Sequence, residues 1–132
     1  MLKYMLDTNI VIYVIKRRPI EVLDTFNRYA GQMCISAITH AELMHGVEKS
    51  TQPEHNLRQV EDFISRLDVL EYDVKVASHY GDIRASLEKL GKPIGINDLH
   101  IAGHARSESL ILVTNNLREF ERVSGLRLEN WI

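Results

Sequence analysis

Four carboxylates lie where apolar runs end or helical patterns begin, at Asp7, Glu42, Asp98 and Glu119. In open α/β sheets, ligands bind in the crevice outside the carboxyl ends of the strands. Carboxylates gathered in such a crevice repel one another and raise one another's pKa values unless a cation joins them. All-oxygen ligands suit Mg²⁺ or Mn²⁺, which clamp phosphate oxygens and activate water. These residue types therefore predict hydrolysis of a phosphodiester bond.

Three of these acids have an ordinary structural explanation when each is taken alone. Asp7 could cap the helix that follows it. Asp98 could cap a later helix, with Asn97 as the competitor, and if Asn97 caps that helix then Asp98 is free for chemistry. Glu119 could be a surface acid that pairs with a neighbouring arginine.

The fourth acid, Glu42, is predicted to point inward. At 100° per residue it lies on the same helical arc as Ile38 and Ala41. A carboxylate on an apolar arc requires either a metal or a basic partner, and His45 is the nearest candidate for the latter. Both explanations of Glu42 stay open from the residues alone.

The elements that would position these acids follow an alternating β-α pattern. Strands are expected at 3–6, 33–36, 69–72 and 110–114, with a short edge strand at 126–131. Helices are expected at 8–16, 20–29, 37–49, 54–67, 74–90, 97–107 and 117–123. This alternation predicts an α/β fold, a sandwich with a central parallel sheet.

The composition predicts one domain, residues 1–132, with 45% hydrophobic content and a formal net charge of −2. No global positive field indicates nucleic-acid binding, so such a role requires local patches such as Lys16-Arg17-Arg18. Cys34 is the only cysteine, which excludes an internal disulfide and fits a reducing cytoplasm. We expect a cytoplasmic protein without a membrane segment.

Two other patterns are set aside. His100 and His104 have the i, i+4 spacing of a zinc pair but lack the glutamate of a His-Glu-x-x-His motif. We expect them on the surface or facing a partner. No phosphate-binding loop of the Walker type is present, which argues against nucleotide-driven chemistry.

Four blocks of sequence together resemble a known family. They are Met5-Leu6-Asp7-Thr8-Asn9, Ile38-Thr39-His40-Ala41-Glu42-Leu43 with Gly46, Pro93-Ile94-Gly95-Ile96-Asn97-Asp98-Leu99-His100-Ile101-Ala102, and Thr114-Asn115-Asn116-Leu117-Arg118-Glu119-Phe120. Their order and residues are similar to those of the VapC toxins, PIN-domain ribonucleases of type II toxin-antitoxin systems, of the enterobacterial and Haemophilus type. The resemblance extends from residue 2 to residue 131.

This resemblance implies a PIN-like α/β/α sandwich and a toxic endoribonuclease that depends on Mg²⁺ or Mn²⁺ and inhibits translation. It implies a VapB-type antitoxin, a toxin homodimer within a larger toxin-antitoxin assembly, and initiator tRNA, cut in its anticodon loop, as substrate. Asp7, Glu42 and Asp98 match the three principal acids of the family, and Glu119 matches an additional acid.

The same resemblance extends to polar neighbours of the acids. Thr8 and Asn9 match polar companions of the first acid, and we predict that they bind substrate together with Thr114 and Asn115. Asn116 stands where many PIN nucleases carry an acid, and we predict that it supports the metal with Glu119.

Two other functions are weighed against cleavage of RNA. A binding module could block translation by occupying an RNA or ribosomal site without cutting it, although bare carboxylates repel phosphate. A phosphomonoesterase that forms an aspartyl-phosphate also places an Asp after its first strand. That chemistry requires a second acid two residues later, where this chain has Asn9.

Overall fold

The computed structural model describes all residues from 1 to 132. Its centre is one five-stranded sheet in the order β3-β2-β1-β4-β5, with every neighbouring pair parallel. The strands are β1 (Tyr4–Leu6), β2 (Met33–Ser36), β3 (Asp68–Leu70), β4 (Ile111–Val113) and β5 (Leu128–Glu129). The chain runs outward from β1 to β3 and returns on the other side of β1 as β4. This reversal creates the kind of crevice in which α/β proteins bind ligands.

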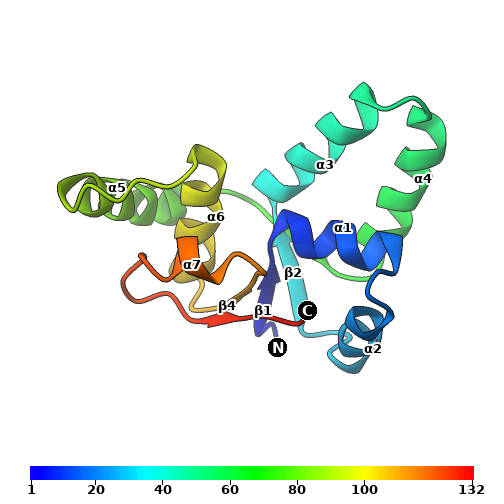
Figure 1. Cartoon of the computed structure of the whole chain (residues 1–132), viewed down its shortest axis with the longest axis horizontal. Helices are drawn as coiled ribbons and strands as arrows, with labels where there is room; N and C mark the ends of the chain where they lie inside the picture. The colour runs from blue at the N-terminus through cyan, green and yellow to red at the C-terminus, as the bar shows by residue number, and fades with distance from the viewer.

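Helices cover both faces of the sheet, as the predicted sandwich requires (Figure 1). They are α1 (Thr8–Lys16), α2 (Ile20–Arg28), α3 (Ala37–Lys49), α4 (Pro53–Ile64), α5 (Val74–Lys89), α6 (Ile96–Ser107) and α7 (Leu117–Phe120). Side chains of β1 alternate between two cores, because successive residues of a strand face opposite ways. Tyr4 and Leu6 pack with α1 to α4, whereas Met5 packs with α5 to α7. No helix has the length and apolar character needed to cross a membrane.

The predicted boundaries hold best where a cap defines them. Asp7 and Ser36 cap α1 and α3, and both helices have the predicted bounds. The helix expected at 54–67 instead ends at Ile64, because the chain must turn before β3 begins at Asp68. The helix expected at 117–123 is one turn long, and the edge strand expected at 126–131 is only Leu128–Glu129.

Helix α6 contradicts the expectation that its histidines face solvent or a partner. Five consecutive residues from Ile101 to Ala105 are buried, because α6 lies between the sheet and α5. A Cβ added at Gly103 would lie 3.0 Å from the backbone nitrogen of Tyr80, so the two helices are in close contact. His104 has no exposed surface, and its Nδ1 lies 2.7 Å from Oγ of Ser36. The prediction was wrong because it assumed one buried face.

His100 is also occupied within the fold. Its ring stacks on Tyr80, with centroids 4.1 Å apart and an interplanar angle of 8°. Its Nδ1 lies 2.8 Å from the hydroxyl oxygen of Tyr72. His100 and His104 therefore belong to the packing between α5, α6 and the end of β3, and they form no zinc pair.

Candidate active site

The four predicted acids come from the carboxyl ends of neighbouring strands. Asp7 follows β1, and Glu42 lies on α3, which begins where β2 ends. Asp98 lies in the first turn of α6, and Glu119 lies in the short helix α7 that follows β4. Because β1 lies between β2 and β4 in the sheet, these elements place the acids together at the carboxyl end of the sheet. We call these four residues the acidic centre.

Asp7 is held rigidly within the acidic centre. Its Oδ1 accepts a hydrogen bond from the backbone nitrogen of Ile10 at 3.0 Å, so it caps α1. Only 5% of the residue is exposed, and this burial raises the pKa of the Asp7 carboxyl. A hydrogen bond with Thr114 opposes the increase, whereas the charge of Glu42 adds to it. Asp7 therefore caps a helix and also faces a second acid.

Glu42 is held by neutral donors. The hydroxyl of Thr8 donates a hydrogen bond to Oε1 of Glu42 at 2.6 Å. The side-chain amide of Asn97 donates to Oε2 at 3.2 Å. His45, which we considered as a basic partner, is exposed and has no ion pair with it. Two elements distant in sequence thus orient this carboxylate and leave its charge without a counterion.

Asp98 and Glu119 form the second half of the acidic centre. Burial, a hydrogen bond with Glu119 and the charges of Glu119, Asp7 and Glu42 together raise the pKa of Asp98 to about 7, and burial is the largest cause. Glu119 accepts hydrogen bonds from the backbone nitrogen of Gly95 at 3.1 Å and from the side chain of Asn116.

Glu119 forms no ion pair, so the surface-pair explanation is not seen in the structure. One of its neighbouring arginines, Arg122, instead donates to the carbonyl oxygen of Pro93 at 3.1 Å. The other, Arg118, is exposed and also lacks an ion pair. Neither neighbouring arginine therefore neutralises the carboxylate of Glu119.

The polar residues predicted to bind substrate divide into two kinds. Thr8 and Thr114 use their hydroxyls on the protein itself, Thr8 toward Glu42 and Thr114 toward Asp7 and the backbone nitrogen of Asn116. Thr114 has no exposed surface. Asn9 and Asn115 are exposed beside the acids, and the amide of Asn115 donates to the hydroxyl of Tyr13 at 3.2 Å. Of the four residues predicted to bind substrate, only Asn9 and Asn115 have exposed side chains.

Asn97 and Gly95 are the contributors that sequence reasoning missed. Gly95 is the cap residue of α6, so neither of the two candidates, Asp98 and Asn97, caps that helix. Asn97 is freed from that position and contacts Glu42 across 55 positions of sequence. The only sequence signal for this contact is an amide side chain directly before an acid.

The chemistry of the acidic centre fits a divalent cation, although its side chains are not gathered around one point. No group of three His, Cys, Asp or Glu side chains is close enough to form a finished metal site. The raised pKa values of Asp7 and Asp98 nevertheless include repulsion from neighbouring acids. A cation bound by oxygen donors would relieve that repulsion. No basic side chain forms an ion pair with any of the four acids.

A parallel α/β sandwich with acids at the ends of adjacent strands defines a class of hydrolytic, phosphate-directed site. The family model for the PIN domain matches residues 4–126. The chain is 67% identical to Ribonuclease VapC2 of Haemophilus influenzae over the full length of both. It is 58% identical to the tRNA(fMet)-specific endonuclease VapC of Shigella flexneri, with 99% of each chain covered.

A solved structure gives the same result in three dimensions. A chain in the crystal structure of DNA-bound VapBC from Salmonella typhimurium superposes with a TM-score of 0.96, at 55% identity and with 100% of both chains covered. The chain therefore belongs to the VapC ribonucleases of the PIN-domain family, which are nucleases of a kind that uses divalent metal ions. The predicted fold and the resemblance are both confirmed.

Proposed function

We propose that the chain, as a single domain of residues 1–132, cleaves initiator tRNA in its anticodon loop and so inhibits translation. Two relatives named tRNA(fMet)-specific endonuclease, at 58% and 56% identity, support this choice of substrate. The observation that carries the reaction is the placement of four acids at neighbouring strand ends with no basic partner for any of them.

The acidic centre would hold Mg²⁺ or Mn²⁺. Asp7, Glu42 and Asp98 are the proposed principal ligands, and Glu119 with Asn116 supports a further cation or ordered water. When bound, the ion supplies charge neutralisation at the scissile phosphate and lowers the pKa of the attacking water. The all-oxygen donor set favours these two ions over zinc.

The surrounding side chains have two proposed roles. Thr8, Asn97 and Thr114 orient the carboxylates, because their polar atoms are engaged with Glu42, Glu42 and Asp7 respectively. Asn9 and Asn115 contact the RNA, because they are exposed beside the acids. Fixed carboxylates favour catalysis because they need no reorganisation when the phosphate arrives.

Cleavage of end-labelled initiator tRNA by Asp7→Asn tests the function. Asparagine is also a good helix cap, so this variant should keep its thermal stability while cleavage is lost. Asp73→Asn is the matched control, because Asp73 caps α5 by accepting from Val76 at 3.1 Å and lies outside the acidic centre. Wild type and the control should both cleave with Mg²⁺.

Two outcomes would contradict the proposal. Full cleavage in excess EDTA would show that the reaction needs no metal. Growth inhibition by Asp98→Asn equal to that of wild type would favour a non-cleaving blocker of translation. Mapping of RNA ends after brief induction identifies the bond that is cut.

We also propose a VapB-type antitoxin as the partner, with two copies of this chain in a larger cytoplasmic assembly. The similar structures from Salmonella, Rickettsia and Haemophilus are described as VapBC complexes. A basic side chain of the partner inserted among the four acids would neutralise them and block the site. Co-expression with the antitoxin should yield a stable complex without ribonuclease activity, and removal of the antitoxin should restore cleavage.

A further inference from the structure

A buried hydrogen bond ties helix α6 to the start of helix α3, the two helices that carry Asp98 and Glu42. Nδ1 of His104 on α6 lies 2.7 Å from Oγ of Ser36, the last residue of β2. Neither His104 nor Ser36 has any exposed surface. The two residues are 68 positions apart in the sequence, so this contact exists only in the folded chain. We call it the Ser36-His104 bridge, and the reaction proposed above assigns it no role.

Ser36 also holds the first turn of α3. Its Oγ accepts a hydrogen bond from the backbone nitrogen of Ile38 at 3.0 Å and so caps the helix. A hydroxyl has one proton and two acceptor lone pairs, so the same oxygen serves both Ile38 and His104. The bridge therefore joins α6 to the cap that determines where α3 begins.

A second polar contact connects the same two helices further along. The side-chain amide of Asn97 on α6 donates to Oε2 of Glu42 on α3 at 3.2 Å. From Ser36 the chain advances six residues to Glu42, and from His104 it goes back seven residues to Asn97. At 1.5 Å per helical residue these steps are about 9 Å and about 10 Å long. The two contacts are thus matched in spacing and together fix how far α6 is shifted along α3.

Of these two contacts, the bridge is the one that water does not reach. Asn97 is exposed, so water competes for its bond to Glu42. In the dry interior a hydrogen bond is electrostatically stronger than at the surface. Asp98 directly follows Asn97, and the charge of Glu42 already contributes to the raised pKa of Asp98. The buried bridge is therefore the firmer constraint on the separation of these two acids.

Packing alone does not require a histidine at position 104. The residue lies among buried apolar neighbours on α6, including Ile101, Ala102 and Ala105. Burying an imidazole costs free energy that an apolar side chain would avoid, and Nε2 of this ring has no hydrogen-bond partner. The ring makes its hydrogen bond to Ser36 instead. This cost indicates a role beyond filling space.

We propose that His104 is a positioning residue for the cleavage of RNA, whose bond to Ser36 sets the register of α6 against α3 and so the separation of Asp98 and Glu42. The proposal rests on the function proposed above, because it takes these two acids as metal ligands. His104 forms no hydrogen bond with either acid and acts through the two helices. A misplacement of about 1 Å that originates far from the reacting atoms can reduce a rate about 100-fold.

Substitutions at position 104 separate positioning from packing. The amide of His104→Asn lies as many bonds from Cα as Nδ1 does and can still bond to Ser36, whereas His104→Leu fills the space without a polar atom. His104→Leu should weaken Mn²⁺ binding, measured by calorimetry, and lower kcat, each by about 10- to 100-fold. The KM for initiator tRNA should stay near that of wild type. His104→Asn should recover most of both losses although it leaves a cavity, whereas a packing role predicts the opposite order.

A change on the other side of the bridge keeps the test open if His104→Leu folds poorly. Ser36→Gly removes the hydroxyl, and glycine is nearly as good a helix cap as serine. This variant should show the same losses in Mn²⁺ affinity and kcat. The double variant Ser36→Gly/His104→Leu should lose no more than either single variant, because both changes remove one shared contact.

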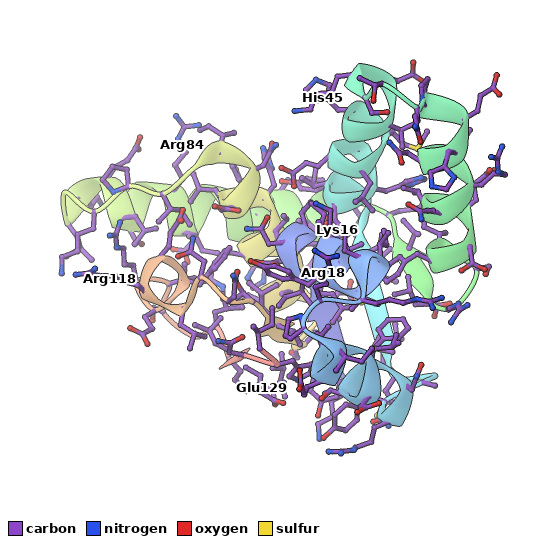
Figure 2. The ribbon with its side chains drawn as sticks, turned by 45° about the vertical axis from the view of Figure 1, so that its right-hand side comes forward. Lys16, Arg18, His45, Arg84, Arg118 and Glu129 are labelled. Carbon is purple, nitrogen blue, oxygen red and sulfur yellow. The ribbon has the colours of Figure 1, made fainter.

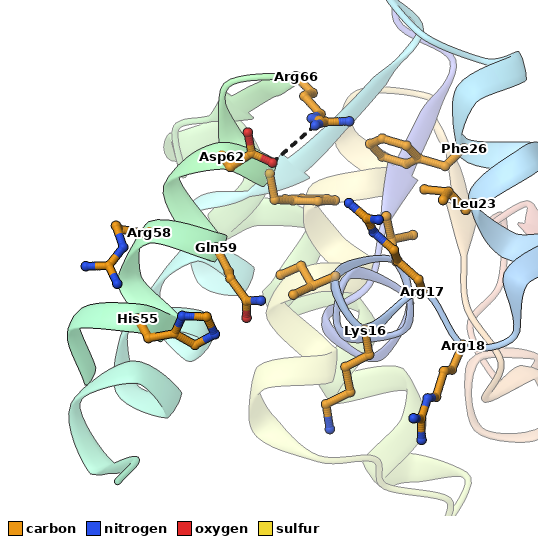
Figure 3. A pocket seen from close by; sticks show the side chains of 13 residues that line it. Lys16, Arg17, Arg18, Leu23, Phe26, His55, Arg58, Gln59, Asp62 and Arg66 are labelled. Atoms are coloured by element: carbon orange, nitrogen blue, oxygen red, sulfur yellow. Dashed lines mark hydrogen bonds and ion pairs between the residues drawn. The ribbon is translucent and has the colours of Figure 1, made fainter. Parts of the chain in front are cut away.

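Two exposed histidines provide matched controls. His45 lies toward the end of α3 that points away from the sheet (Figure 2). His55 lines a cavity of about 640 Å³ between α4 and the α1-α2 connection (Figure 3). His45→Leu and His55→Leu should keep kcat and the Mn²⁺ Kd within about twofold of wild type.

The same measurements can overturn the inference. Wild-type kcat and Mn²⁺ affinity in His104→Leu would contradict it, as would additive losses in the double variant with Ser36→Gly. A wild-type chain that neither binds Mn²⁺ nor cleaves RNA would instead overturn the proposed function, so the two failures are distinct.

Discussion

The two ends of helix α1 present opposite chemistry. At its start, Asp7 is buried, hydrogen-bonded and close enough to Glu42 for that charge to raise its pKa. At its last turn, Lys16 and Arg17 are exposed and unpaired. The helix dipole favours both arrangements, because it attracts anions at the first turn and cations at the last. A single short helix thus separates a buried, anionic end from a solvated, cationic end.

The two regions differ in how much their charges destabilise the folded chain. The acids are partly buried and repel one another, which raises the pKa values of Asp7 and Asp98. The cations at the end of α1 are solvated, so each affects stability little. Neutralising an acid of the acidic centre should therefore abolish cleavage without lowering stability, whereas removing a cation at the end of α1 should change stability little.

Asp98→Asn gives the strongest test of this contrast. Loss of a proposed metal ligand should reduce cleavage at least about 100-fold. Because the pKa of Asp98 is about 7 in the folded chain and ordinarily 3.8, ionisation of this carboxyl opposes folding increasingly between these pH values. Without metal at pH 8, the variant should have a free energy of unfolding about 1 to 2 kcal/mol above that of wild type, with the shift discounted for partial exposure.

Chemical denaturation in EDTA at pH 8 and at pH 4 measures this effect. At pH 4 the Asp98 carboxyl is largely protonated in the folded chain, so the two proteins should converge. A variant that is less stable than wild type at pH 8 would show that charge repulsion does not dominate the acidic centre.

Thr8→Val separates positioning from ligation within the acidic centre. The change removes the hydroxyl that donates to Glu42 at 2.6 Å while keeping a similar shape. Misplaced carboxylates of this kind reduce activity about 10- to 100-fold. The Kd for RNA should stay near that of wild type. Thr8→Ser restores a hydroxyl and should recover most of the kcat, and a silent Thr8→Val would remove this contact from the mechanism.

The same contrast explains how much of the fold and of the site could be predicted from the sequence. The strand-to-helix switches at Asp7 and Ser36 are local signals, so α1 and α3 have their predicted bounds. The position of Asp98 on a buried stripe follows from helical periodicity. The contact between Asn97 and Glu42 depends on how α3 and α6 meet, which periodicity does not contain. The cavity between α4 and the end of α1 likewise depends on how those two helices pack.

His104 shows what long-range packing adds behind the acidic centre. Burial lowers the pKa of this histidine, and its Nε2 has no hydrogen-bond partner. Below its ordinary pKa of 6.5, the unfolded chain therefore binds a proton that the folded chain resists. This contribution to stability is present at neutral pH and is lost as the pH falls below about 6.5, by up to about 1.4 kcal/mol per pH unit.

His104→Gln should therefore flatten the pH dependence. We expect wild type to lose more stability than the variant between pH 7.5 and pH 5.5 in urea denaturation. The other titrating groups, including the acidic centre, are common to both proteins and cancel in the comparison. Parallel pH curves would show that protonation of His104 is not what limits stability in acid.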